Sequence, residues 1–151
     1  MYSGWKIEEI EAELERLSAI LVDVRMVPRS RAPIWNSGVL ARRLNDPSAG
    51  SGQGRYVWIR ELGNRNYKGT VDQIAKSPTS PPANSMRELL ALSPAEGTAT
   101  GKAVVLLCGC PDVNQCHRKL LADWLAKLWK AEVVHLTRPD NQISSGQGTL
   151  F

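Results

Sequence analysis

Three cysteines and one histidine of this 151-residue chain fall within one short segment. Cys108, Cys110, Cys116 and His117 carry the thiol and imidazole groups that zinc takes as ligands in Cys3His sites. Their C-x-C-x5-C-H spacing differs from that of zinc ribbons and fingers, and two adjacent ligands at a helix start should point in different directions. We therefore expect no resident metal or cofactor, and a zinc ion held by these four residues is the alternative.

The end of this segment, Cys116-His117-Arg118, lies where the sequence predicts that a helix begins. The first N–H groups of a helix lack partners and can hold an anion, and Arg118 adds a guanidinium suited to phosphate or carboxylate. The same charges favour the thiolate of Cys116, as in reactive cysteines. We predict that His117 and Arg118 bind a ligand and that Cys116 is a candidate nucleophile. The alternative is a cysteine packed as a small apolar residue beside a histidine that caps the helix.

Polar residues also follow two other predicted strands. In chain order they are Asp23, Arg25, Arg29, Arg31, Glu61 and Asn64. Ligands of open α/β sheets bind beyond the carboxyl ends of the strands, where these residues and the cysteine segment should meet. We predict that Asp23 and Glu61 are acid–base candidates and that the arginines and the asparagine bind the ligand.

A charge at a strand end persists only if it is paired, so we expect Asp23 and Arg25 to be partly buried. We expect them to contact the Cys116–Arg118 segment, directly or through Arg31. Trp35 and Trp58 lie near the arginine segments and could stack a base, although aromatic residues near a sheet usually serve packing.

The elements that must position these residues alternate between helix and strand. Apolar residues spaced by three and four predict helices over residues 5–18, 36–44, 85–92 and 117–130. Short apolar runs predict strands over residues 19–24, 56–59, 103–107 and 133–136. Continuously apolar strands are typical of parallel sheets covered on both faces. We therefore predict an α/β fold, a small three-layer domain with a mostly parallel sheet flanked by helices.

The polar segments also resemble a known family. The segments are Leu21-Val-Asp23-Val-Arg25 with Pro28-Arg-Ser30-Arg31, then Glu61-Leu-Gly63-Asn64, then Leu107-Cys108 and Cys116-His117-Arg118. They resemble, in the same order, the motifs of the domain of unknown function 488 family. The resemblance implies a compact α/β domain with these motifs around one pocket, and it implies no established reaction. Two positions depart from the family pattern. Family members usually begin with a short strand that ends in a glycine, and here this strand is reduced to Met1–Gly4. Cys110 stands where an acidic residue is frequent in the family.

Composition narrows the class of protein. The chain is 42% hydrophobic and 23% charged, as globular domains are, and no apolar run reaches the roughly 20 residues that span a bilayer. Three cysteines cannot all pair and the N-terminal stretch lacks a signal-peptide pattern, so we expect a cytoplasmic protein with reduced thiols. A net charge of +4 favours anionic partners. Because no apolar run is long enough to span a bilayer, we expect no membrane association.

Together these features predict an anion-binding pocket of arginine, cysteine and histidine for a phosphorylated small molecule or a nucleic acid. Whether the protein is an enzyme is open. An enzyme of DNA or RNA metabolism is one hypothesis. The alternatives are a non-catalytic nucleic-acid-binding adaptor and a zinc-stabilised interaction module.

We expect residues 1–139 to form a single α/β domain and residues 140–151 to form a polar tail. Gln147, Leu150 and Phe151 resemble the Q-x-x-L-F peptide with which bacterial replication and repair proteins dock on the sliding clamp. The Gly/Ser-rich stretch before this peptide would act as a flexible spacer. The alternative is that Leu150 and Phe151 fold back onto the domain.

Overall fold

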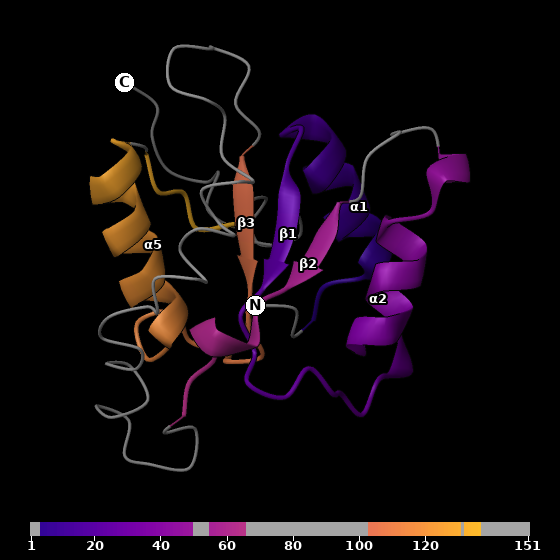
Figure 1. Cartoon of the computed structure of the whole chain (residues 1–151), viewed down its shortest axis with the longest axis horizontal. Helices are drawn as coiled ribbons and strands as arrows, with labels where there is room; N and C mark the ends of the chain where they lie inside the picture. The colour runs from indigo at the N-terminus through magenta and orange to yellow at the C-terminus, as the bar shows by residue number, and fades with distance from the viewer. Residues whose placement is uncertain (1–3, 50–54, 66–102, 131, 137–151) are drawn as a thin grey trace, which may run out of the picture.

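The computed structural model describes residues 4–49, 55–65, 103–130 and 132–136. Three parallel strands form a sheet in which β1 (Ile20–Asp23) lies between β2 (Tyr56–Trp58) and β3 (Val104–Leu107) (Figure 1). All four residues of β1 are buried, as a central strand covered on both faces requires. The predicted parallel sheet is confirmed for these three strands.

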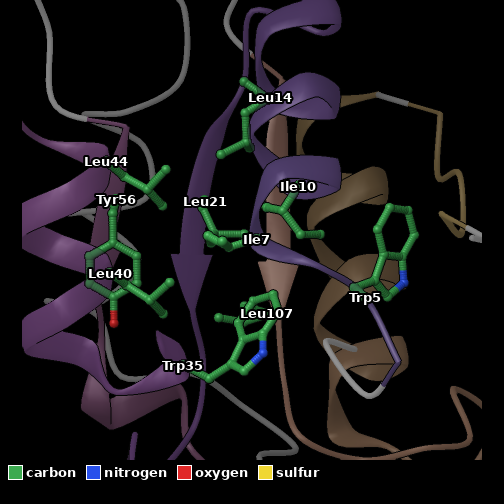
Figure 2. Close-up of a cluster of buried hydrophobic side chains, with 11 residues drawn as sticks. Trp5, Ile7, Ile10, Leu14, Leu21, Trp35, Leu40, Leu44, Tyr56 and Leu107 are labelled. Atoms are coloured by element: carbon green, nitrogen blue, oxygen red, sulfur yellow. The ribbon is translucent and has the colours of Figure 1, made fainter. Parts of the chain in front are cut away.

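Helices cover both faces of the sheet. α1 (Ile7–Arg16) and α2 (Ser37–Leu44) pack in one apolar cluster with Leu21 of β1 (Figures 1 and 2). α5 (His117–Trp129) packs in a second cluster, which contains Val22 and Val24. Because successive side chains of a strand point to opposite faces, the two clusters lie on opposite sides of the sheet. The predicted three-layer α/β domain is confirmed.

The predicted strand over residues 133–136 is wrong, because this stretch has no regular secondary structure. Val134 is 68% exposed, whereas Leu136 packs against the cluster of α1 and α2. β-Branched residues favour a strand locally, but a strand also needs burial and a pairing partner. α1 likewise begins at Ile7, two residues later than predicted.

The side chain of the residue before α2 contacts the loop after β1 and not the helix end. Asn36 precedes the helix, but its side chain makes no capping hydrogen bond. Its Oδ1 instead accepts a hydrogen bond from the backbone N–H of Ser30 (2.7 Å). Asn36 therefore anchors the loop that carries Arg29 and Arg31.

Several predictions fall outside the described residues. They are the helix over residues 85–92, the 140–151 tail, and sliding-clamp docking through Gln147, Leu150 and Phe151, all of which stay predictions. Among the helices of the described ranges, none has the length and apolar character needed to cross a membrane.

Candidate functional site

The segments that follow the three strands meet at one edge of the sheet, toward which all three arrowheads point in Figure 1. We call residues 24–32, 59–65 and 108–118 the carboxyl edge. Val24 N donates to Leu107 O (3.0 Å), and Ile59 N donates to Asp23 O (3.1 Å), so hydrogen bonds join the three strand ends. Because β2 and β3 lie on opposite sides of β1, this edge includes the point where strand order reverses, which is the usual ligand site of open α/β sheets.

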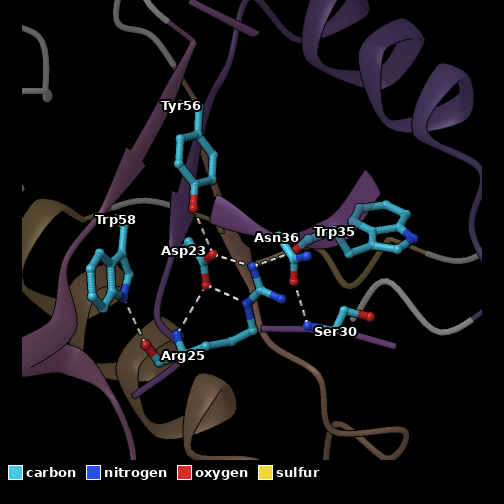
Figure 3. Close-up of polar contacts among 7 residues, drawn as sticks. All are labelled: Asp23, Arg25, Ser30, Trp35, Asn36, Tyr56 and Trp58. Carbon is cyan, nitrogen blue, oxygen red and sulfur yellow. Dashed lines mark hydrogen bonds and ion pairs between the residues drawn. The ribbon is translucent and has the colours of Figure 1, made fainter. Parts of the chain in front are cut away.

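A buried ion pair between Asp23 and Arg25 lies at the carboxyl end of β1 (Figure 3). Asp23 is completely buried and Arg25 is 6% exposed. Arg25 Nε donates to Asp23 Oδ1 (2.8 Å), and Arg25 Nη2 donates both to Asp23 Oδ2 and to the carbonyl oxygen of Trp35 (2.9 Å). The hydroxyl of Tyr56 donates to Asp23 Oδ2 (2.8 Å). Burial of the pair is therefore confirmed, and it is more complete than predicted.

This pair connects with the cysteine segment through the backbone of Val24, the residue between Asp23 and Arg25. His117 Nε2 lies 2.9 Å from Val24 O. A carbonyl oxygen only accepts, so Nε2 carries the hydrogen and donates it. Arg31, the expected intermediary, lies exposed on the loop after β1, and Val24 was not expected in this role.

The contact with Asp23 gives Tyr56 a measurable signature. Burial and the neighbouring Asp23 carboxylate raise the pKa of Tyr56 above its ordinary value of 10.0. The protonated phenol therefore stabilises the fold below pH 10, and this contribution is lost as the pH rises toward the higher folded-state pKa.

We expect Tyr56 to stay protonated in the folded protein between about pH 10 and 11, where an ordinary tyrosine ionises. Folded wild type and the Tyr56→Phe variant should then show the same tyrosinate absorbance change over that range. After denaturation, wild type should gain one tyrosine equivalent over the variant. A larger change in the folded wild type would contradict the buried contact.

Two sets of arginines in the described residues differ in their ion pairing. Those paired with glutamates of α1 are Arg16, Arg43 and Arg55. The exposed arginines of the carboxyl edge are Arg29, Arg31, Arg60 and Arg65, and within the described ranges none of these four forms an ion pair. The positive charge of the carboxyl edge is therefore not neutralised as it is around α1.

The four sulfur and nitrogen groups of the cysteine segment converge. One ligand atom from each of Cys108, Cys110, Cys116 and His117 lies within 4.8 Å of all the others. Cys110 is half-buried and the other three are buried. The expectation that Cys116 and His117 point apart is wrong, because Cys116 has an extended backbone (φ −118°, ψ 134°) while His117 begins α5. This change of backbone direction brings both side chains to one point.

These groups also shift one another's protonation. Hydrogen-bond contacts with Cys110 and Cys116 lower the pKa of Cys108 far below its ordinary value. The interactions of Cys116 with Cys108 and Cys110, together with burial, raise the pKa of Cys116. Burial opposes a charged His117, but hydrogen bonds to Cys108 and Cys110 outweigh it and raise its pKa to about 9. The lowered thiol pKa is therefore that of Cys108, whereas the sequence suggested Cys116.

The remaining predicted site residues lie around this centre. Glu61 is exposed on the 3-10 turn Arg60–Leu62, and Asn64 is buried directly after it. Arg118 is half-buried, and its Nη1 is buried without a hydrogen-bond partner among the described residues. The catalytic roles of Asp23, Glu61 and Cys116 stay predictions, as do the ligand-binding roles of the arginines, Asn64 and His117.

Sequence reasoning missed two contributors to the buried pair. Tyr56 was only part of a predicted strand, and the backbone carbonyl of Trp35 carries no signal in the sequence. Trp35 itself is only 5% exposed and packs in the cluster of α1 and α2, which confirms the packing role and excludes base stacking on its ring. Trp58 is 40% exposed, and its indole Nε1 donates to the carbonyl oxygen of Arg25 (2.9 Å; Figure 3).

Comparison with known proteins gives one match. A family model described as "Domain of unknown function DUF488" matches residues 6–125. No curated protein and no solved structure matches the chain. The matched range includes all three strands and the segments of the carboxyl edge.

Proposed function

Because the chain belongs to the domain of unknown function 488 family, whose description names no activity, we propose its function from the site itself: the carboxyl edge binds single-stranded nucleic acid. The observation that carries this proposal is the contrast between paired and unpaired arginines. The glutamates of α1 neutralise the arginines beside them, whereas the exposed arginines of the carboxyl edge form no ion pair within the described residues. Arginines without protein partners are suited to phosphate oxygens.

The charge balance of the carboxyl edge supports a polyanionic ligand. Its arginines, other than the buried Arg25, are Arg29, Arg31, Arg60, Arg65 and Arg118. Its carboxylates are Glu61 and Asp112, both exposed. Positive charge therefore exceeds negative charge where the sheet topology favours a ligand, and phosphate contacts supply most of the sequence-independent affinity of nucleic-acid-binding proteins.

Trp58 supplies a surface for bases. It is the last residue of β2, directly before Ile59 and Arg60, and it is 40% exposed. The hydrogen bond to Arg25 O fixes the ring edge to the loop after β1. Proteins bind single strands with an exposed indole near arginines, since bases stack on the ring and phosphates contact the cations. Trp58 and the arginines of the carboxyl edge, which form no ion pair within the described ranges, offer both.

Arg118 adds a position for one phosphate group. Its Nη1 is buried and lacks a partner among the described residues, an arrangement that costs free energy unless a ligand oxygen accepts the hydrogen bond. Arg118 also lies in the first turn of α5, where the helix dipole favours an anion.

We expect a fluorescein-labelled oligothymidylate to bind the full chain, as measured by fluorescence anisotropy. The Arg29→Ala/Arg31→Ala double variant should raise the Kd about tenfold or more, because two phosphate contacts are lost. Trp58→Ala should also raise it about tenfold, in line with the loss of one stacked base.

The control is Arg42→Ala, which removes one positive charge from an exposed arginine of α2, outside the carboxyl edge. The residue that ends this helix, Asn45, contacts Tyr56 at the start of β2, so Arg42 lies toward the opposite edge of the sheet. Arg42→Ala should bind like wild type. Absence of saturable binding, or equal weakening in all variants, would refute the proposal. A mononucleotide that competes as well as the oligonucleotide would show that the ligand is a phosphorylated small molecule.

A further inference from the structure

Three of the six distances among the ligand atoms of Cys108, Cys110, Cys116 and His117 are close to those of a tetrahedral zinc site, and all six are within 4.8 Å. Zinc bonds of about 2.3 Å to sulfur and about 2.0–2.1 Å to nitrogen give tetrahedral edges of about 3.8 Å between sulfurs and about 3.6 Å between sulfur and nitrogen. Here the Sγ atoms of Cys108 and Cys110 are 3.5 Å apart. Nδ1 of His117 is 3.9 Å from Sγ of Cys108 and 3.9 Å from Sγ of Cys116. These three edges differ from the ideal values by only about 0.3 Å.

We propose that these four residues bind one zinc ion in a closed tetrahedral site that joins the loop after β3 and the start of α5 to the end of β1. Three thiols and an imidazole are soft and borderline ligands, which favour zinc over magnesium or calcium. Four protein ligands leave no open position for water, so the site is structural and not catalytic.

The imidazole of His117 is already oriented for this role. Its Nε2–H donates to Val24 O (2.9 Å), which leaves Nδ1 to face the thiols with a free lone pair when the ring is neutral. Metal-binding histidines usually donate their second N–H to such a carbonyl or to a carboxylate, which fixes both the tautomer and the ring. His117 and Val24 are both fully buried, so the contact has little freedom to rearrange.

The backbone explains how an unusual spacing produces the site. Cys108 and Cys110 stand on either side of the exposed Gly109, and their Sγ atoms lie 3.5 Å apart. The extended conformation of Cys116 before α5 then turns its thiol toward His117. The backbone N–H of Arg118 donates to Cys116 Sγ (3.4 Å), a contact that stabilises a metal-bound thiolate.

The test is zinc content and affinity of the full chain, reconstituted with zinc under reducing conditions and freed of excess metal. We expect about one zinc per chain by elemental analysis, and an absorption spectrum of tetrahedral thiolate coordination when Co²⁺ replaces zinc. Cys110→Ser changes the half-buried ligand, so the fold should tolerate it, and it should weaken zinc binding more than about tenfold. The control is His135→Ala. His135 is the chain's other histidine and is exposed, so this variant should bind zinc like wild type.

A wild-type content below about 0.2 equivalents after reconstitution would overturn the proposal. So would a Co²⁺ spectrum without thiolate coordination, or unchanged zinc affinity in Cys110→Ser. The nucleic-acid proposal uses the side chains of other residues. Arg118 is involved in both, but the zinc site uses only its backbone N–H. The failure of one proposal therefore leaves the other intact.

Discussion

Replacing Arg25 by alanine is expected to lower the free energy of unfolding by about 3–5 kcal/mol. The substitution leaves the carboxylate of Asp23 completely buried and deprived of its ion-pair partner, with the phenol of Tyr56 as the remaining side-chain donor in Figure 3. Small domains are stable by only about 5–15 kcal/mol, so this loss should be visible as a large shift of the urea unfolding midpoint.

Arg43→Ala is the matched control for this prediction. Arg43 also forms ion pairs, with Glu8 and Glu11, but on the surface of α1 and α2. Exposed ion pairs contribute at most about 1 kcal/mol, so the control should unfold close to wild type. Equal losses in the two variants, or a loss below about 1 kcal/mol in Arg25→Ala, would show that the buried pair does not hold the end of β1 in place.

Gly63→Ala is expected to destabilise the protein by about 3 kcal/mol or more. A Cβ at Gly63 would lie 2.5 Å from Met26 Cα and 2.8 Å from Arg60 O, and both of these atoms belong to the backbone. The backbone of Gly63 (φ −69°, ψ 151°) is open to any residue, so the close approach to Met26 and not the conformation requires glycine. The added methyl group would force apart the loops that follow β1 and β2, and thermal unfolding would report it.

Gly38→Ala makes the same chemical change where space is free. A Cβ at Gly38 meets nothing within 4 Å, and the residue lies in α2. Alanine favours a helix over glycine by about 1 kcal/mol, so this variant should be as stable as wild type or more stable. If Gly63→Ala unfolded at the wild-type temperature, the contact between the two loops would be contradicted.

The sequence predicted the fold where burial alone determines an element. Residues 20–23 are continuously apolar up to Asp23, and the spacing of Leu121 and Leu125 matches one face of α5, so period and composition were sufficient. The run at residues 133–136 has the same local composition, yet Val134 is exposed. A strand there depends on a pairing partner, and no pattern within four residues reports one.

The sequence predicted which residues gather at the site, but not the contacts that they make there. Strand ends and topology place Asp23, the arginines and the cysteine segment at one edge, and this follows from a parallel sheet. The partner of Arg25 is Asp23 two residues away, and their link to His117 passes through a backbone carbonyl, which a sequence does not display. The convergence of Cys116 and His117 depends on a change of backbone angle at one residue, which ligand spacing alone does not reveal.

The salt dependence of oligothymidylate binding tests the central claim, nucleic-acid binding by the unpaired arginines, most directly. Each phosphate contact to a single strand contributes about −0.7 to the slope of log K against log salt concentration. Arg31→Ala should therefore make the wild-type slope less negative by about 0.7, while Arg42→Ala leaves it unchanged. A wild-type affinity independent of salt, or an identical slope in Arg31→Ala and wild type, would contradict the account.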